Sequence, residues 1–361
     1  MSPPLTPARG RGAQSNASGR FETLASEAFD DGWTDADASP AKLTTSLTPE
    51  RARTIISRND SPDVGFDRSI NPYRGCEHGC IYCYARPAHA YVGLSPGLDF
   101  ESKIFFKPEA GRLLARELAR PSYRVGVIHI GGNTDPYQPA ERRLQVTRQV
   151  LEVLEGAAHP CSIITKSALI MRDADILGSM ARARLARAAI SLTTLDRGLA
   201  RIMEPRAATP ERRLVAMATL ARAGVPVIVM FAPVIPGLND HELEAVLERA
   251  AKAGAVGAGY VVLRLPREIK DLFREWLEVA APDRAKRVMS LVRQMRGGRD
   301  YDPNWGQRMK GDGPIAEILG RRFAVAKRRF GLDRTIAALD LNQFRRPGPP
   351  SHQPDLFATG S

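Results

Sequence analysis

The sequence predicts an α/β fold, a partial (β/α)6 barrel of the TIM type. Short apolar segments rich in β-branched residues recur roughly every 30 residues, and helical patterns fill the gaps between them. The Gly-x-Gly-x-x-Gly fingerprint of dinucleotide-binding folds is absent. Strand–helix alternation at this spacing produces parallel strands, and about six units suit a partial barrel better than a doubly wound sheet.

Each expected element has its own sequence signal. The expected strands cover residues 66–73, 125–130, 161–165, 188–192, 225–231 and 260–263. The expected helices cover residues 108–120, 140–155, 173–187, 210–223 and 241–253. The fourth helix has the clearest ends, because Thr209 is a good N-cap, Pro210 suits the first helical position and Gly224 suits a left-handed C-cap.

Composition divides the chain of 361 residues into four parts. Residues 1–45 are rich in small and polar residues and are expected to be a disordered arm, and residues 46–266 form the core barrel. Residues 267–345 are expected to be a basic, mainly helical extension, followed by a flexible Pro-rich tail at 346–361. Residues 284–346 carry a net charge of +10 out of +12 for the chain, which predicts contact with a polyanion such as nucleic acid.

Several classes of protein are excluded by the sequence. No apolar run approaches the ~18 residues of a membrane span, and the N-terminus lacks the apolar stretch of a secretory signal. Four cysteines do not make a disulfide scaffold for a chain of this length. We therefore expect a cytoplasmic protein whose reduced thiols are available for metal.

Three of the cysteines lie within eight residues, after the first expected strand. Cys76, Cys80 and Cys83 are spaced C-x3-C-x2-C in a polar loop with two glycines, so they must converge from a loop on one object. Three soft thiolates suit an iron–sulfur cluster or zinc. A zinc site would need a fourth ligand, for which His78 and His89 are candidates.

This cysteine spacing, with an aromatic residue before the last cysteine, resembles the radical S-adenosylmethionine (SAM) superfamily. The run from Asn71 to Arg86 looks like the uncharacterised bacterial relatives of spore photoproduct lyase, and the resemblance covers roughly residues 57–266. It implies a [4Fe–4S] cluster on Cys76, Cys80 and Cys83, with SAM bound at the open iron. It also implies reductive cleavage of SAM to a 5′-deoxyadenosyl radical that abstracts hydrogen, and an external electron donor such as flavodoxin or ferredoxin.

The resemblance also implies SAM contacts at the ends of the barrel strands, where the functional residues of such folds lie. Tyr82 matches an aromatic residue that contacts adenine, and Lys166 matches a residue that contacts the SAM carboxylate. The turn after the second strand holds the methionine amino group in the superfamily through a Gly-Gly-Glu-like sequence. The residues expected at this turn and after the fourth strand are Gly131, Gly132, Thr134, Asp135 and Ser191.

One departure bears on the substrate. Spore photoproduct lyase has a cysteine at the second-strand turn that returns a hydrogen atom to product, and Gly132 occupies that position here. Photoproduct repair itself is therefore not supported. Tyr84, which matches a relay tyrosine, is the candidate catalytic residue for hydrogen transfer.

We expect a radical SAM enzyme that acts on nucleic acid, because of the basic block and of Arg264 and Arg267 after the sixth strand. The alternatives are radical modification of a protein or small molecule, and a zinc-stabilised nucleic-acid-binding protein without catalysis. Within the tail, residues 353–357 (Gln-Pro-Asp-Leu-Phe) resemble peptides that dock on the bacterial DNA sliding clamp. Such a peptide would place Leu356 and Phe357 in an apolar pocket.

Overall fold

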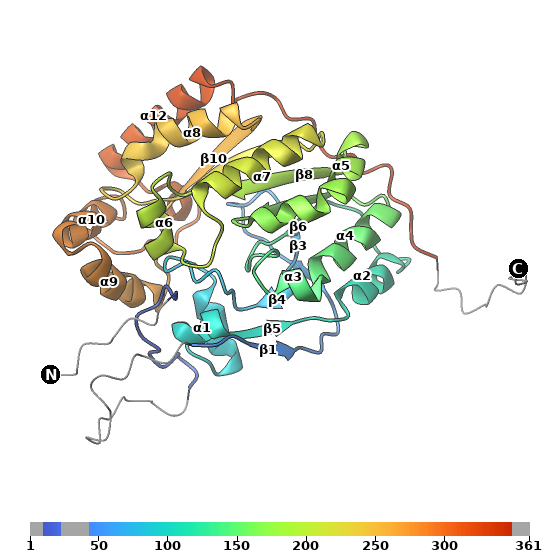
Figure 1. The fold of residues 1–361 in the computed structure, drawn as a ribbon, viewed down its shortest axis with the longest axis horizontal. Helices are drawn as coiled ribbons and strands as arrows, with labels where there is room; N and C mark the ends of the chain where they lie inside the picture. The colour runs from blue at the N-terminus through green and yellow to red at the C-terminus, as the bar shows by residue number, and fades with distance from the viewer. Residues whose placement is uncertain (1–9, 23–42, 349–361) are drawn as a thin grey trace, which may run out of the picture.

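The structure, a computed structural model that describes residues 10–22 and 43–348, is centred on a seven-stranded sheet in the order β10-β9-β8-β7-β6-β3-β2 (Figure 1). Its six parallel strands follow chain order, and β2 pairs antiparallel to β3. The predicted α/β class with a parallel sheet is confirmed. The strands are β2 (Ile56–Arg58), β3 (Arg68–Ile70), β6 (Ile128–Ile130), β7 (Cys161–Thr165), β8 (Ala186–Ser191), β9 (Val227–Val234) and β10 (Gly257–Val262).

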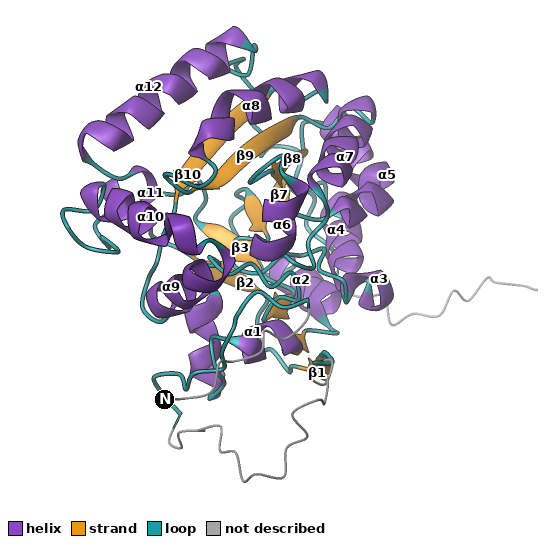
Figure 2. Ribbon diagram, turned by 60° about the vertical axis from the view of Figure 1, so that its left-hand side comes forward, coloured by secondary structure: helices purple, strands orange, loops and turns teal. Residues whose placement is uncertain are grey.

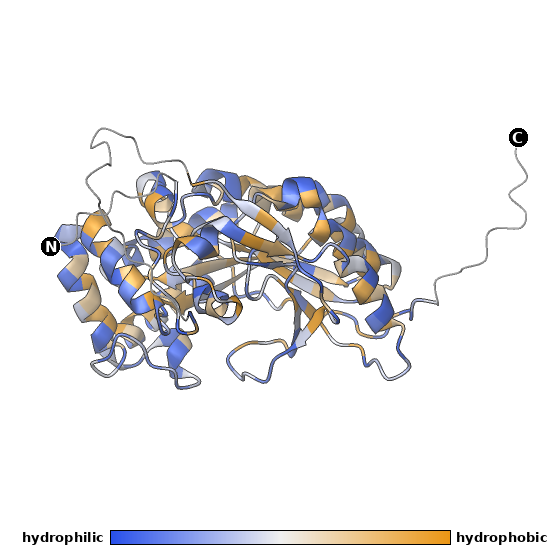
Figure 3. Cartoon of the chain, turned by 90° about the horizontal axis from the view of Figure 1, so that it is seen from below, coloured by the Kyte–Doolittle hydropathy of each residue, from blue (hydrophilic) through white to orange (hydrophobic). Residues whose placement is uncertain are grey.

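Helices connect the parallel strands and cover one face of the sheet (Figures 1 and 2). Along β7, the buried residues alternate with partly exposed ones, as expected where one face packs against helices. In Figure 3 the helices carry both hydrophilic and hydrophobic residues, as amphipathic helices do. They are α2 (Ala110–Leu118), α3 (Glu141–Leu144), α4 (Val146–Gly156), η2 (Ala168–Asp173), α5 (Ala174–Arg182), α6 (Arg197–Met203), α7 (Pro210–Arg222), η3 (Asp240–Glu242) and α8 (Leu243–Lys252).

Two of the predicted helices differ from the observed ones. The single helix expected at 140–155 is divided into α3 and α4 by Gln145, whose φ of 51° breaks the helix. The helix expected at 173–187 ends at Arg182, because Arg184 has a φ of 57° and the chain then enters β8. The predicted ends of the fourth helix are observed: Thr209 caps α7 and Gly224 has a φ of +84°.

A smaller sheet lies beside the first parallel strand. It has the order β1-β5-β4 and consists of β1 (Ser46–Pro49), β4 (Tyr73–Arg74) and β5 (Lys103–Phe106). The 3-10 helix η1 (Arg86–Val92) and α1 (Leu98–Ser102) connect β4 to β5. Together they surround the loop that carries the three cysteines.

The expectation of a disordered arm over residues 1–45 is wrong for residues 10–22, which pack against α1 and its neighbours (Figure 1). Arg11 and Ala13 are buried there, at 6% and 1% exposure. The sequence did not indicate this packing, because the segment has few apolar residues and its contacts include hydrogen bonds between backbone N–H groups and side chains that are 83 to 89 positions apart. Residues 1–9 and 23–42 lie outside the described part.

Four helices follow the last strand: α9 (Ile269–Ala280), α10 (Pro282–Gln294), α11 (Gln307–Lys310) and α12 (Gly313–Arg329). The loop between β2 and β3 reaches α11, where the Gly306 N–H and the Arg308 guanidinium bond to the Asp63 carboxylate. Among the described residues, no helix is both long and apolar enough to span a membrane.

After α12, residues 332–346 run without helix or extended strand; we call them the C-terminal crossing segment. Asp333 forms a bridge with Gly257 at the start of β10, and the Asp340 N–H donates to the Arg184 carbonyl just before β8. The Arg345 N–H donates to the Ala157 carbonyl before β7, at 2.8 Å. The segment therefore passes the beginnings of three parallel strands in turn.

Candidate active site

The three cysteines lie on a loop between β4 and η1, residues 75–85, that has no regular structure but whose backbone is hydrogen-bonded from several sides. The Cys76 N–H donates to the Phe100 carbonyl at 2.9 Å, and the Ile81 N–H donates to the Met203 carbonyl at 3.1 Å. The Gln138 side chain accepts from the Glu77 N–H and donates to the Gly75 carbonyl. Because neighbours hold the backbone in place, the loop can present three side chains without a helix or strand of its own.

Arg86 fixes the centre of this loop. Its guanidinium is fully buried and donates to the carbonyls of Gly79 (3.1 Å) and Cys80 (2.9 Å). It also pairs with the carboxylate of Glu101, which is fully buried as well. A buried arginine needs such partners for its donors, so the loop and this pair depend on one another.

The three thiols are in protein interior rather than water. Cys76 and Cys80 are 6% and 7% exposed, and Cys83 is partly buried. Burial raises the pKa of all three thiols above the ordinary value, and Cys80 and Cys83 each also raise the pKa of Cys76 through their charge. Burial disfavours the thiolate form of these thiols unless a positive charge lies close to the sulfurs. A bound metal centre supplies such a charge, so the three thiols are suited to act as its ligands.

The donors at this loop are three cysteine sulfurs, a set that suits an iron–sulfur cluster. A zinc ion would need a fourth ligand. In the described parts of the chain, no group of three or more His, Cys, Asp or Glu side chains meets the geometry of a site for one metal ion.

The two histidines considered as a fourth zinc ligand have different surroundings. His78 Nδ1 lies 3.3 Å from the Asp135 carboxylate. His89 is fully buried with its ring 5.5 Å from that of Phe100, and burial lowers its pKa to about 4.

The turn after β6 packs tightly against its neighbours. Gly131 has a φ of +88°, and a Cβ atom there would lie 2.6 Å from the Ile164 carbonyl oxygen, so the turn requires glycine. Thr134 is buried and donates to the Tyr73 carbonyl at 2.8 Å. Its hydroxyl is thus used within the chain, and the expected direct contact with SAM stays a prediction.

Asp135 connects this turn to the end of β7. Its carboxylate accepts from the Thr165 hydroxyl (2.6 Å), the Lys166 N–H (2.8 Å) and the Tyr137 N–H (2.9 Å). Burial alone would raise its pKa, but His78 and these hydrogen bonds lower it to about 2. In the structure this carboxylate fixes the backbone of Lys166, and its predicted contact with SAM also stays a prediction.

Lys166, directly after β7, lies beside the cysteine loop. Its Nζ lies 5.6 Å from the centroid of the Tyr82 ring. Its charge also lowers the pKa of the Cys80 and Cys83 thiols, against the larger effect of burial. The structure therefore gathers Cys80, Cys83, Tyr82 and Lys166 at one place.

A buried ion pair that the sequence analysis missed lies behind Tyr82. The Glu204 carboxylate accepts from the Tyr82 hydroxyl and from the Thr193 hydroxyl (2.7 Å), and it pairs with Arg213. Burial alone would raise the Glu204 pKa, but the charges of Arg213 and Lys166 lower it to about 2. Arg213 also donates to the carbonyl of Ser191, which is itself 3% exposed.

Glu204-Pro205-Arg206 is a visible motif, but its pairing partners could not be read from the sequence. Arg206 pairs with Glu77 of the cysteine loop at 3.1 Å, and its N–H donates to the His78 carbonyl. The segment after α6 is therefore a second support of the cysteine loop.

Tyr84 contacts the turn after β6. The residue is 45% exposed, and its hydroxyl donates to the carbonyl of Gly132. The guanidinium of Arg264 lies 5.1 Å from the ring centroid. The Tyr84 hydroxyl therefore lies at Gly132, the position that the sequence analysis compared with the lyase cysteine.

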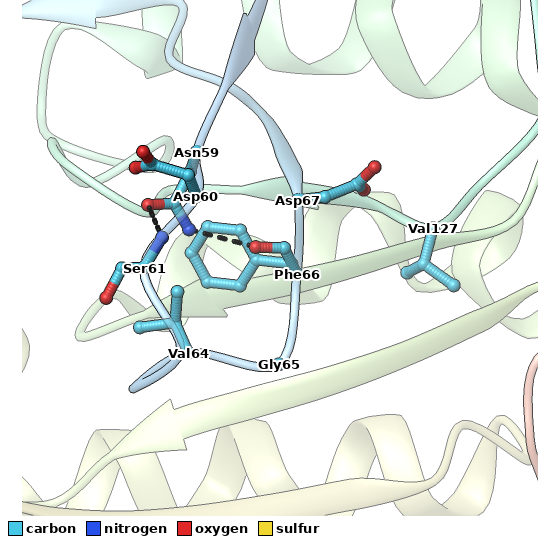
Figure 4. Close-up of a pocket in the computed structure, with 8 residues that line it drawn as sticks. All are labelled: Asn59, Asp60, Ser61, Val64, Gly65, Phe66, Asp67 and Val127. Carbon is cyan, nitrogen blue, oxygen red and sulfur yellow. Dashed lines mark hydrogen bonds between the residues drawn. The ribbon is translucent and has the colours of Figure 1, made fainter. Parts of the chain in front are cut away.

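A hollow of about 510 Å³ is formed by the loop between β2 and β3 together with Val127 (Figure 4). It lies beside the turn after β6 and not at the cysteines. The Asn59 side chain braces the loop by bonding the Phe66 carbonyl and the Ser61 N–H. Phe66 also stacks on His129 at 4.2 Å and would lie 3.4 Å from a Cβ on Gly132. Asp60 and Asp67 in the lining make the hollow unsuited to an anionic ligand.

The basic C-terminal block contains both paired and unpaired cations. Arg293, Arg308 and Arg322 each pair with a carboxylate. Within residues 10–22 and 43–348, no salt bridge is formed to the exposed cations of α10 and the end of α12, which are Arg284, Lys286, Arg287, Arg328 and Arg329. Residues 353–357 lie outside the described part.

Comparison with known proteins supplies the last observation. Residues 70–250 match the model of the Radical SAM superfamily. An uncharacterized protein of Mycobacterium tuberculosis is 37% identical over 295 residues, which cover 81% of this chain and 80% of that protein. An uncharacterized protein of Methanocaldococcus jannaschii is 28% identical over 173 residues, 48% of this chain and 62% of that protein.

Among solved structures, spore photoproduct lyase complexed with dinucleoside spore photoproduct is similar, with a TM-score of 0.55. The match covers 79% of each chain at 15% identity. At this identity the likeness establishes the fold alone.

Proposed function

Since this chain belongs to the radical SAM superfamily, we propose that it is an enzyme which holds a [4Fe–4S] cluster on Cys76, Cys80 and Cys83 and uses S-adenosylmethionine. The observation that carries the proposal is that one loop holds the three cysteines and Tyr82, with the Lys166 ammonium 5.6 Å from the Tyr82 ring. We also infer that the six parallel strands form the partial (β/α)6 barrel of this superfamily.

The cluster, when bound, would supply one electron for the reductive cleavage of SAM to methionine and a 5′-deoxyadenosyl radical. The protein's part is to bind and orient. Lys166 offers a cation for the carboxylate of SAM, and Asp135 holds the Lys166 backbone. Tyr82 offers an aromatic face for adenine, and Glu204 fixes its hydroxyl. The turn at Gly131 and Gly132 would hold the methionine amino group, and Ser191, Thr134 and Asp135 complete the predicted set.

Tyr84 is proposed as the residue that passes a hydrogen atom to or from substrate. In support, its ring is exposed and its hydroxyl is fixed by the Gly132 carbonyl. Arg264 on the ring would bring a negative charge of the substrate close to this phenol.

The proposed substrate class is nucleic acid. The support is the net charge of +10 over residues 284–346 and the unpaired cations on α10 and α12. Docking of residues 353–357 on the DNA sliding clamp is part of the same proposal, because it would bring the enzyme to DNA. An external electron donor such as flavodoxin or ferredoxin is also proposed, because reductive cleavage of SAM consumes an electron.

The decisive experiment is anaerobic. The protein is reconstituted with iron and sulfide, reduced with dithionite and incubated with SAM, and 5′-deoxyadenosine is measured. Production that is lost in Cys76→Ala, Cys80→Ala and Cys83→Ala, but kept in the matched control Cys161→Ala, would support the proposal. Cys161 is fully buried in β7 and belongs to the hydrophobic core, so it tests for general damage.

Two other results would lead to other functions. A colourless protein with one zinc per chain and no deoxyadenosine would favour the zinc-stabilised nucleic-acid-binding alternative. Deoxyadenosine production without salt-dependent DNA affinity would favour modification of a protein or small molecule.

A further inference from the structure

Residues 11–13 are far from the cysteines in sequence but lie directly against the backbone of the cysteine loop. The Gly12 and Ala13 N–H groups donate to the two carboxylate oxygens of Glu101, at 2.9 and 2.8 Å. The same carboxylate pairs with Arg86, whose other donors hold the carbonyls of Gly79 and Cys80. One buried carboxylate therefore joins the N-terminal segment to the cysteine loop.

Gly12 also touches the loop itself. A Cβ atom on Gly12 would lie 1.8 Å from the Gly79 carbonyl oxygen, so that no other residue fits without displacing the loop between Cys76 and Cys80. Ala13 is 1% exposed and belongs to the same apolar cluster as Cys80, Ile81 and Tyr82. The segment thus covers the loop on the side of its backbone.

Arg11 provides a second connection. Its guanidinium donates to the Glu101 carbonyl (2.6 Å) and to the Thr45 hydroxyl (3.0 Å). The Thr45 hydroxyl in turn donates to the carboxylate of Glu77 (2.8 Å), which lies between Cys76 and His78 and pairs with Arg206. A continuous hydrogen-bonded chain therefore runs from Arg11 to the cysteine loop and on to the segment after α6.

We propose that Arg11, Gly12 and Ala13 are positioning residues of the cluster site, which lock the cysteine loop in its cluster-binding conformation and exclude water from its backbone side. The proposal rests on the proposed function only in that the loop holds a cluster. Its physical basis is that a loop without regular structure keeps three ligands in place only if other residues fix it, and residues behind metal ligands commonly control metal retention.

Retention of the cluster is the direct test. We compare wild type, Gly12→Ala and Arg11→Ala with Gly156→Ala, a matched glycine whose added Cβ meets no atom within 4 Å. All are loaded anaerobically, and the rate of iron transfer to a ferrous chelator is followed by absorbance. We expect iron loss to be about tenfold faster or more in both N-terminal variants, and Gly156→Ala to match wild type. Equal rates in all four proteins would overturn the proposal.

A second measurement needs no variant and therefore does not depend on a variant's folding. If the segment stabilises the loaded loop, loading must stabilise the docked segment by the same free energy. Hydrogen exchange in the peptide that contains Gly12 and Ala13 should be slower in the loaded wild type than in the apoprotein. Unchanged exchange on loading would contradict the proposal.

The two proposals fail separately. A wild-type chain that takes up no iron and sulfide refutes the proposed function. The role of this segment alone is refuted if the wild-type chain loads normally, the variants lose iron at the wild-type rate, and exchange in the peptide with Gly12 and Ala13 does not change on loading.

Discussion

The ammonium of Lys166, at the end of β7, lies 5.6 Å from the centroid of the Tyr82 ring in the cysteine loop. Two positions 84 residues apart in the chain are thereby brought together at the expected SAM site. The backbone of Lys166 is fixed by Asp135, so three elements of the fold meet at this contact.

Replacement of Lys166 should reduce the affinity for SAM more than it reduces the iron content. A hydrogen bond to a charged group contributes about 1.5–3 kcal/mol, so Lys166→Met should weaken SAM binding by roughly 10- to 100-fold. Iron content should remain near that of wild type, because the Lys166 side chain is not a ligand. Calorimetric titration of SAM into the loaded enzyme measures the effect, with the exposed Lys252→Met as control. Unchanged SAM affinity would remove Lys166 from the site.

The ion pair behind Tyr82 should be essential for folding stability. In Glu204→Gln the Arg213 guanidinium, 1% exposed, would keep its charge without its carboxylate partner, and the free energy of unfolding should fall by about 3–5 kcal/mol. Urea unfolding of the apoprotein is the measurement. Glu248→Gln breaks an exposed pair with Lys252 and should change little. Equal stabilities of the two variants would show that the buried pair is dispensable.

The stability of the apoprotein should fall as pH is lowered from about 6.5 towards 4. His89 and His159 are fully buried, and burial lowers the pKa of each to about 4. Because the unfolded chain binds protons at ~6.5, unfolding takes up a proton at each histidine in this range, and stability is fully present only above it.

Each of these histidines should contribute up to about 1.4 kcal/mol per pH unit. Urea unfolding midpoints between pH 7 and 5 measure the slope. His159→Gln should lower the slope by the contribution of one proton. An unfolding midpoint that does not change over this range would argue against neutral buried imidazoles.

The unpaired cations of α10 should determine how DNA binding depends on salt. Neutralising Arg284, Lys286 and Arg287 to Gln should reduce the slope of log K against log salt by up to about 3, if each contacts a phosphate. Fluorescence anisotropy over a salt series measures the slope. The exposed residues Arg112, Arg142 and Arg143, on α2 and α3, give a control triple variant with the same change in charge. Equal slopes for both triple variants would place the DNA elsewhere.

Residues 346–361 should bind the bacterial sliding clamp as an isolated peptide. Leu356 and Phe357 are the expected anchors, so a peptide with both changed to Ala should not bind. Titration of labelled peptides with clamp up to about 100 μM tests this. Equal binding of both peptides, or of neither, would dismiss the motif.

Local signals in the sequence were sufficient to predict the parallel strands of the seven-stranded sheet. The strand expected at 161–165 is β7, and the other parallel strands lie within a few residues of their expected positions. The cysteine loop and Lys166 could be located because parallel strands bring the residues after their carboxyl ends to one edge of the sheet.

What the sequence could not indicate depends on contacts between distant residues. Glu204 has Arg213 nearby, but the choice of Arg213 rather than Arg206 as its partner is decided by burial. The packing of residues 10–22 depends on the carboxylate of Glu101, some 90 positions away, and such pairing leaves no periodic pattern. The bonds of Thr134 to the Tyr73 carbonyl of β4 and of Asp135 to Thr165 of β7 likewise join residues that are distant in sequence.

The C-terminal crossing segment has a consequence for the order of folding events. Its residues bond at the start of β10 and just before the starts of β8 and β7. These contacts join parts of the chain that are far apart in sequence, and contacts of such long sequence separation form late in folding. We therefore expect docking of this segment to be a late step, so that the beginnings of these strands become protected from solvent after the rest of the sheet.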